Sequence, residues 1–391
     1  MTKPAAFQLR RLVFPVFLPS LLISIAEGAM FPVVPAAAER LGTDIPTAGL
    51  LAGLFMLGTL VADLPAAQLV FRFGERATMI GTAWITALGI ALAYFSDTVF
   101  ALGAANLIAG ASAAVFGLAR QGFMAHNVPA THRARSFALL GGMFRGGGFI
   151  GPALASYLIW QFDIRTVFLG AVIFCVATAV VLMIAGAAGF EDDRPEPSTS
   201  VWSVAKAERH KLFTLGTASA ILASVRTIRA IGLPLWALAI HLSPVDTTLY
   251  LAIAGAVDFA LFYSSGQIMD RYGRRASAVP TLIATGITLL FVFAAQDGTG
   301  FLILAIAMAL ANGIGSGVIM VLGADLAPPK SRNEFLASYR MVVDAAMAGS
   351  APLLSLLVAV FGLTGAMSGF GLLSFFGAWL MYRYIPRFER H

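Results

Sequence analysis

The stretch that decides the fold is "GQIMDRYGRR", from Gly266 to Arg275, because a related stretch, "AQLVFRFGER", runs from Ala67 to Arg76. The two stretches lie 199 residues apart, and each ends a long apolar run with a glycine among basic residues. The same offset relates other anchors along the chain, carrying Pro35 to Pro234 and Pro129 to Pro328. A fixed offset that holds over roughly ninety residues predicts two copies of one unit.

The composition is that of a membrane protein. Hydrophobic residues make up 59% of the chain, charged residues make up 12%, and the mean hydropathy is +0.84. Soluble domains hold about 45–50% apolar residues even when glycine is counted. The single cysteine, Cys175, excludes a disulfide or a cysteine-rich metal site within one chain. The first apolar segment follows "MTKPAAFQLRR" without a cleavage pattern, so we expect it to be retained.

The apolar runs predict an all-α membrane protein. A helix needs about 20 apolar residues to cross the bilayer core, and short polar or Pro/Gly-rich breaks divide this chain into twelve such runs. The predicted spans are 12–38, 47–70, 78–95, 99–123, 136–160, 166–189, 212–240, 247–269, 277–295, 300–324, 335–360 and 363–384. Twelve spans place both termini on the same side of the membrane.

The basic residues indicate which side that is. Nearly all lysines and arginines outside the spans fall in the termini or in loops on the side of the termini, and the exceptions are Arg40 and Arg165. Cytoplasmic loops accumulate such residues, so we expect both termini to be cytoplasmic, in the inner membrane of a bacterium. The pI near 9.7 follows from this topology, and we expect no nucleic-acid partner.

One connection is both long and hydrophilic, and it divides the chain into a first half, 1–189, and a second half, 212–391. The linker, 190–211, is either a plain tether or, over "VWSVAKAERH", a short amphipathic helix on the inner membrane surface. Two six-span repeats are typical of a transporter whose binding site lies near the midplane, where the halves meet.

The repeated basic stretch resembles a signature of the major facilitator superfamily of secondary transporters, Gly-x-x-x-Asp-Arg-x-Gly-Arg-Arg. The second copy matches it in full with Gly266, Asp270, Arg271, Gly273, Arg274 and Arg275, and the first copy keeps Arg72, Gly74 and Arg76. The resemblance implies twelve transmembrane helices in two pseudo-symmetric six-helix bundles. It also implies alternating access in a lipid bilayer, a small-molecule substrate and no cofactor or metal.

The motif has a physical interpretation of its own. A glycine permits a tight turn, and arginines favour the anionic inner leaflet. We expect Asp270 to pair with arginines and with the positive N-terminus of a neighbouring helix, a contact that breaks when the halves rock apart. Phe71 replaces this aspartate in the first copy, so the hypothesis is a gating latch carried mainly by the second copy. The alternative is a basic loop that only fixes topology.

Span five resembles a further signature, Gly-x-x-x-Gly-Pro-x-x-Gly-Gly, of the family's drug:proton antiporters. Its residues here are Gly147, Gly151, Pro152, Ala155 and Ser156. Small residues let helices approach closely, and proline loosens one turn so that the helix can bend. The resemblance implies multidrug export. Asn106 stands in span four where these antiporters usually carry an arginine, which is a departure from their pattern.

Ionisable residues inside the spans need a reason, because each charge costs at least about 2.5–3.5 kcal/mol at the helix centre unless it is paired or hydrated. Arg120 and Arg340 lie near the inner ends, and we expect their side chains to reach water. The deeper set, with Asp63 at intermediate depth, is Glu27, Asp63, Arg145, Arg226, Arg229, Asp258 and Asp344. The offset of 199 maps Glu27 onto Arg226 and Arg145 onto Asp344, so we expect opposite charges at equivalent depths.

These residues suggest a coupled transport mechanism. Glu27 is the leading candidate for protonation, and the further candidates are Asp63, Asp258 and Asp344. The candidates for binding polar or anionic substrate groups, or for holding the carboxylates, are Glu27, Arg145, Arg226 and Arg229. Permanent ion pairs that lock the halves together are the structural alternative.

The main prediction is a monomeric transporter that exports amphipathic or hydrophobic small molecules in exchange for protons. The deep arginines outnumber what Glu27 needs, so transport or flipping of organic or lipid-linked anions is the alternative, and passive facilitation is a third. An enzyme is disfavoured, since the histidines lie outside the spans or at their ends. "GIGSG" at 313–317 misses the Gly-x-Ser-x-Gly spacing because Ile314 occupies the required glycine. Nothing resembles a channel filter.

Overall fold

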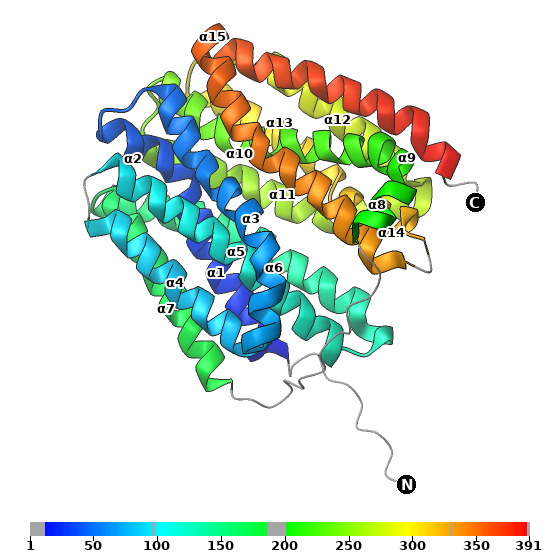
Figure 1. The fold of residues 1–391 in the computed structure, drawn as a ribbon. Coiled ribbons are helices and arrows are strands. Elements are labelled where there is room, and N and C mark those ends of the chain that lie inside the picture. The colour runs from blue at the N-terminus through cyan, green and yellow to red at the C-terminus, as the bar shows by residue number, and fades with distance from the viewer. Residues whose placement is uncertain (1–11, 96–97, 186–200, 329–330, 389–391) are drawn as a thin grey trace.

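The computed structural model describes residues 12–95, 98–185, 201–328 and 331–388, whose regular elements are all helices (Figure 1). The first predicted span contains four consecutive helical segments, and one helix follows in each of the next five predicted ranges. In order, these elements are η2 (Val13–Phe17), α1 (Leu18–Met30), η3 (Phe31–Val33), α2 (Val34–Arg40), α3 (Ile45–Phe73), α4 (Glu75–Phe95), α5 (Val99–Asn127), α6 (Ala130–Gln161) and α7 (Arg165–Ile184).

The predicted linker lies outside the described residues as far as residue 200. From residue 201 it is helical, and Trp202 is 75% exposed on its surface. The second half then repeats the pattern of the first. The elements are α8 (Val201–Ala207), α9 (Arg209–Lys211), η4 (Leu212–Gly216), α10 (Thr217–Ala239), α11 (Pro244–Tyr272), α12 (Arg274–Leu290), η5 (Val292–Ala294), α13 (Gly298–Ile314), α14 (Val318–Leu326) and α15 (Arg332–Phe388).

Nine helical stretches among the described residues are long and apolar enough to cross a membrane, judged by length and composition. α6 and α12 are not in this group, although they occupy the predicted spans five and nine; α12 has only 17 residues. α15 passes through the predicted spans eleven and twelve. Its non-helical residue, Gly362, has φ 71° and ψ 170° and lies between those two spans. The chain is therefore an all-helical membrane protein.

The helix starts follow the internal repeat. Asp44, Thr98, Ser243 and Asp297 each accept a hydrogen bond from the backbone N–H three residues further on, at 2.7–3.2 Å. Such caps satisfy N–H groups that have no partner within the helix. Asp44 and Ser243 are 199 residues apart, and so are Thr98 and Asp297. We call the end of the bundle that carries these four residues the capped end.

Arg40, one of the two exceptions to the charge asymmetry, is paired at the capped end. Its Nη1 lies 2.5 Å from Asp163 Oδ1, in the connection between α6 and α7. Burial raises the pKa of Asp163, but the hydrogen bond and charge of Arg40, together with nearby backbone N–H groups, outweigh it and bring the pKa below its ordinary value. This pair ties two connections of the first half together.

The helix contacts also repeat. In the first half α1 packs on α6, α3 on α5 and α4 on α7, while in the second half α10 packs on α15, α11 on α13 and α12 on α15. The first and second halves meet mainly where α6 packs on α11 and where α3 packs on α15. In Figure 1, α1 to α7 (blue to green) and α10 to α15 (green to red) lie on different sides of the molecule.

Candidate functional site

A half-buried ion pair joins the first and second halves where α6 packs on α11. Arg145 Nη1 lies 2.8 Å from Asp258 Oδ1, and the two side chains are 20% and 16% exposed. Arg229 of α10 approaches the other carboxylate oxygen at 3.6 Å, and Asn312 of α13 donates a hydrogen bond to that oxygen at 2.8 Å. One carboxylate thus gathers side chains from three other helices.

Arg226 lies one turn before Arg229 on α10, and its hydrogen bond goes to the backbone. Arg226 Nη2 donates to the Gly315 carbonyl oxygen at 2.7 Å, and Nε is buried with no hydrogen-bond partner among the described residues. Arg226 is also within electrostatic range of Arg145, Arg229 and Asp258. Three arginines therefore surround a single carboxylate, and we call these four residues the arginine cluster.

The carbonyl that Arg226 binds belongs to a break in span ten, between α13 and α14. Gly317 has a φ of 80° there, a conformation that favours glycine. Ser265 Oγ of α11 lies 2.7 and 2.8 Å from the carbonyl oxygens of Ile314 and Ser316, and its single hydroxyl hydrogen is shared between these groups that lost helical partners. The sequence signal of this break was the stretch "GIGSG", whose glycines interrupt an apolar run.

Glu27 and Arg120 form a second charged centre within the first half. They interact electrostatically, and Glu27 is half-buried. Arg120 is only 4% exposed; its guanidinium lies 4.2 Å from the centre of the Phe144 ring and donates a hydrogen bond to Ser20 Oγ at 3.3 Å. The prediction that Arg120 reaches water is wrong, because these contacts hold its side chain inside the bundle.

The opposite charges that the offset of 199 relates do not pair with each other; each has another partner. Arg145 pairs with Asp258 instead of Asp344, and Glu27 interacts with Arg120 instead of Arg226. Asp344 accepts a hydrogen bond from Arg340 at 3.1 Å, one turn away on α15. Arg340, 44% exposed, also approaches Asp63 of α3 at 3.7 Å.

The ion pairs Arg145–Asp258 and Arg340–Asp63, which join the halves in the described part of the chain, are nevertheless related by the repeat. Adding 195 carries Asp63 to Asp258 and Arg145 to Arg340. This offset is four residues short of 199, about one helical turn. In these two pairs, each half supplies one aspartate and one arginine. The two pairs are related by an offset one turn shorter than the offset of 199 that relates the prolines and the helix caps.

The glycines of the two motifs make the turns expected of them. Gly74 and Gly273 have φ of 78° and 83°, so each ends a helix in a conformation that other residues resist. We call this end of the bundle the motif end. In the first copy, Arg76 donates to the carbonyl oxygens of Leu182 and Met183 at 3.3 and 2.9 Å, at the negative C-terminal end of α7.

The second copy uses a different acid from the one expected. Arg274 Nε lies 2.9 Å from Asp325 Oδ2, near the end of α14, and the Arg275 guanidinium lies 3.5 Å from the centre of the Tyr382 ring. Asp270 is exposed in the last turn of α11 and forms no hydrogen bond or ion pair within the described ranges. The expected pairing of Asp270 is therefore absent here because its side chain faces outward.

The remaining motif residues make local contacts. Arg72 and Arg271 each lie over the aromatic ring of the next residue, at 5.4 and 5.3 Å. A methyl group added at Gly266 would have no atom within 4 Å, so this glycine is not required by a close neighbour. α14 connects the arginine cluster to the second motif, because its start adjoins the Gly315 carbonyl bound by Arg226 and its end carries Asp325, the partner of Arg274.

The glycines of span five bring α6 against α1. A methyl group at Gly147 would lie 2.4 Å from Ser24 Cβ, and one at Gly151 would lie 2.5 Å from the Ala29 backbone nitrogen. Neither distance is compatible with a Cβ atom unless the backbones move apart. These two glycines are therefore packing residues for the pair of helices that carries Glu27 and Arg145.

Pro152 affects the other side of α6. It has no N–H, so the Gly148 carbonyl lacks its helical donor. A methyl group at Gly255 of α11 would lie 2.9 Å from this oxygen, which shows how closely α11 approaches the free carbonyl. The glycines of α6 thus allow close contact with α1 within the first half, and Pro152 leaves a free carbonyl at the contact with α11 of the second half.

Two hydrogen bonds close the capped end between the halves. Ser156 of α6 donates to the Val245 carbonyl oxygen at 3.0 Å, and Ser355 of α15 donates to the Pro46 carbonyl oxygen at 2.8 Å. Adding 199 carries Ser156 to Ser355 and Pro46 to Val245. The repeat therefore makes the same bond twice, once from each half.

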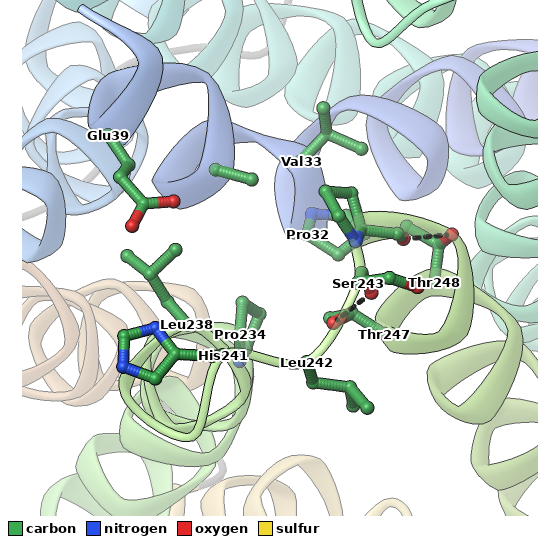
Figure 2. A pocket seen from close by; sticks show the side chains of 12 residues that line it. Pro32, Val33, Glu39, Pro234, Leu238, His241, Leu242, Ser243, Thr247 and Thr248 are labelled. Atoms are coloured by element: carbon green, nitrogen blue, oxygen red, sulfur yellow. Dashed lines mark hydrogen bonds between the residues drawn. The ribbon is translucent and has the colours of Figure 1, made fainter. Parts of the chain in front are cut away.

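A pocket of about 250 Å³ lies beside these bonds, at the capped end (Figure 2). The first half contributes Val33 and Glu39 to its wall, and the second half contributes His241 and the hydroxyl-bearing start of α11. Ligand pockets usually span about 300–1,000 Å³. We assign this smaller space to the closed mouth between the halves, since residues of both halves line it.

The repeated halves, the discontinuous tenth span and the charged centre between the halves define the class of the protein as a membrane transporter. The family model described as Major Facilitator Superfamily matches residues 16–275 and 215–391. The chain belongs to the major facilitator superfamily and is not an enzyme. No curated protein matches it.

Solved structures that share this fold include those of peptide transporters. A POT family transporter in complex with 5-aminolevulinic acid aligns with a TM-score of 0.82 and 12% identity, covering 99% of this chain and 98% of that one. One in complex with a thioalcohol-conjugated peptide aligns with 0.82 and 12%, covering 97% and 96%. The peptide transporter POT in complex with sulfate aligns with 0.80 and 12%, covering 99% and 96%. At these identities the likeness establishes the fold alone.

Proposed function

We propose that this secondary transporter works by alternating access with twelve transmembrane helices in two six-helix bundles, residues 1–189 and 212–391, joined by a cytoplasmic linker. The helix contacts that recur in each half, the caps 199 residues apart and the reciprocal serine bonds support this division. The serine bonds hold the capped end closed, so the opposite, motif end is the one through which substrate reaches the arginine cluster in this conformation.

We propose that the substrate is a small organic anion, which includes lipid-linked anions. The observation that carries this proposal is the arginine cluster, in which the described residues place Arg145, Arg226 and Arg229 near one carboxylate, that of Asp258. Surplus positive charge is costly in a membrane interior, and an anionic substrate group reduces that cost. The same surplus repels the lipophilic cations typical of multidrug substrates, so the cluster favours anions over the drug-efflux alternative.

We propose that Glu27 couples transport to protons, with Asp63, Asp258 and Asp344 as further candidates. Glu27 faces Arg120, and the proton occupancy of a carboxylate changes when it gains or loses an arginine neighbour. Helix rearrangement during alternating access changes such neighbours. Export, a bacterial inner membrane, cytoplasmic termini and a monomeric state remain predictions from the sequence.

Ligand-dependent melting of the purified protein tests the substrate class. We expect organic anions to raise the melting temperature, because a ligand that binds only the folded state stabilises it, and we expect lipophilic cations to leave it unchanged. Arg226→Gln should abolish most of the anion effect. Arg165→Gln, at the first residue of α7, is the matched control and should retain it. Stabilisation by cations alone would overturn the anion proposal.

Transport in proteoliposomes tests the coupling residue. Glu27→Gln should abolish accumulation driven by a pH gradient while substrate exchange without a gradient continues, because the substitution removes the titratable group and keeps the shape of the side chain. Glu39→Gln, at the closed mouth, is the control and should still respond to the gradient. If Glu27→Gln accumulates substrate as the unmodified protein does, Glu27 does not couple protons.

A further inference from the structure

We propose that the arginine cluster binds a ligand carrying two negative charges, as in a dicarboxylate or a phosphate monoester. This inference rests on the proposed transport of organic anions and specifies the charge of the anion. It follows from the charges that the described residues place around Asp258, from the way that its oxygens are occupied, and from the neutral partner of Arg226.

The charges in the cluster do not cancel. Two guanidinium groups contact one carboxylate and a third, that of Arg226, lies within electrostatic range of it, which leaves a surplus of two positive charges. The nearby polar side chain that contacts Asp258 is the neutral amide of Asn312. An aspartate at this position would have removed one unit of the surplus. Glu27 does not contribute a counter-charge, because within the described chain it interacts with Arg120.

Asp258 does not bind the third arginine of the cluster. Oδ1 accepts from Arg145 at 2.8 Å, and Oδ2 is shared by Asn312 at 2.8 Å and Arg229 at 3.6 Å. Arg226 donates instead to the Gly315 carbonyl, which satisfies a hydrogen bond but supplies no negative charge. Its buried Nε has no described partner, so a donor remains to be used. The cluster therefore offers both uncompensated charge and an unused donor.

The number of charges decides which ligand binds best. Charges a few ångströms apart in a protein interact strongly, because the effective dielectric constant is about 20 and not 80. A ligand with one negative charge leaves one buried guanidinium uncompensated, whereas a ligand with two negative charges makes the occupied site neutral. A neutral ligand gains nothing from the surplus. The affinity should therefore rise with each charge up to two.

The test uses glutarate, its monomethyl ester and its dimethyl ester, which share one carbon skeleton and carry two, one and no negative charges at neutral pH. Isothermal titration to the purified full-length protein measures the three affinities. We expect glutarate to bind at least about tenfold more tightly than the monoester, and the dimethyl ester to show no binding. Methyl phosphate is a second dianion, and it distinguishes a carboxylate preference from a requirement for charge alone.

Two variants change the surplus in opposite directions. Arg229→Gln lowers it to one, so the preference for glutarate over the monoester should disappear. Asp258→Asn raises it to three, so the preference should grow. Asn312→Ala is the matched control: it removes a contact to Asp258 without changing the charge, and the ratio of the two affinities should stay within about threefold of the original. If Asp258→Asn does not fold, the loss or retention of the glutarate preference in Arg229→Gln still tests the inference.

The outcomes separate this inference from the proposed function. If glutarate and its monoester bind equally well, or if Arg229→Gln leaves their ratio unchanged, the dianion inference is wrong while anion transport stands. If neither of these anions nor methyl phosphate binds, and lipophilic cations do, both the inference and the proposed substrate class are wrong.

Discussion

Asp258→Asn should lower the free energy of unfolding by about 3–5 kcal/mol, the largest effect that we expect from a polar substitution in this protein. The substitution leaves the Arg145 and Arg229 guanidinium groups without a counter-charge, and the side chains at the ion pair are only 16–20% exposed. A buried charge that loses its partner is more costly than a pair that is removed whole. Thermal unfolding in lipid nanodiscs measures the change.

Asp344→Asn is the matched control for this prediction. Asp344 also pairs with an arginine inside a predicted span, but Arg340 is 44% exposed, so water screens the interaction. We expect a change below about 1 kcal/mol there. The double variant Arg145→Gln, Asp258→Asn should recover part of the stability that Asp258→Asn loses. Equal destabilisation by both aspartate substitutions would mean that burial does not determine the strength of these pairs.

Gly147→Ala should destabilise the contact between α1 and α6 by about 3 kcal/mol, near the upper end of the usual range for overpacking. The added methyl group would lie 2.5 Å from the Ser24 carbonyl carbon and 2.8 Å from the Ile25 nitrogen, so rotating a side chain cannot relieve the clash. The two helices would have to separate. The fraction of folded protein recovered from membranes and its melting temperature measure the effect.

Gly148 provides an unusually close control, since it is the next residue of the same helix. A methyl group at Gly148 would meet no atom within 4 Å. Alanine is favoured over glycine inside a helix by roughly 0.5–1 kcal/mol, so Gly148→Ala should leave stability unchanged or raise it slightly. Similar losses for both alanine variants would show that the helix tolerates no substitution in this stretch for reasons other than contact with α1.

The repeat made much of the fold predictable from the sequence. Apolar length placed helices in the predicted ranges, and Gly362 interrupts α15 where the predicted spans eleven and twelve are separated. The caps at Asp44 and Ser243, 199 residues apart, are residue types that favour helix starts, and the repeat places them at equivalent positions. Apolar runs, glycine breaks and helix caps depend on residues close together in the sequence, so the sequence alone is enough to predict them.

The partners of the deep charges could not be predicted in the same way. The offset of 199 related Arg145 to Asp344, whereas the ion pairs between halves follow an offset of 195. The expected partner of Arg145, Asp344, lies on α15, whereas the actual partner, Asp258, lies on α11, the helix that packs closely on α6 through small residues such as Gly255. An offset between two copies says which positions are equivalent but not which helices touch, so the sequence pattern alone does not identify these partners.

The partner of the second motif was missed for a similar reason. The signature drew attention to Asp270, but the acid that Arg274 contacts is Asp325, 51 residues away on α14. Its position depends on the break at Gly317, which directs the last turns of span ten toward the motif loop. A glycine-rich stretch inside an apolar run was the available signal, and it indicates such a break more directly than it indicates an enzyme motif.

The reciprocal serine bonds and the ion pair between Arg340 and Asp63 both join the two halves, but they differ in their sensitivity to salt. The Ser156 and Ser355 bonds join neutral groups, so dissolved ions do not weaken them. The Arg340 and Asp63 side chains are 44% and 29% exposed, and salt screens such a pair. Ionic strength therefore weakens one of these contacts between the halves and leaves the serine bonds unchanged.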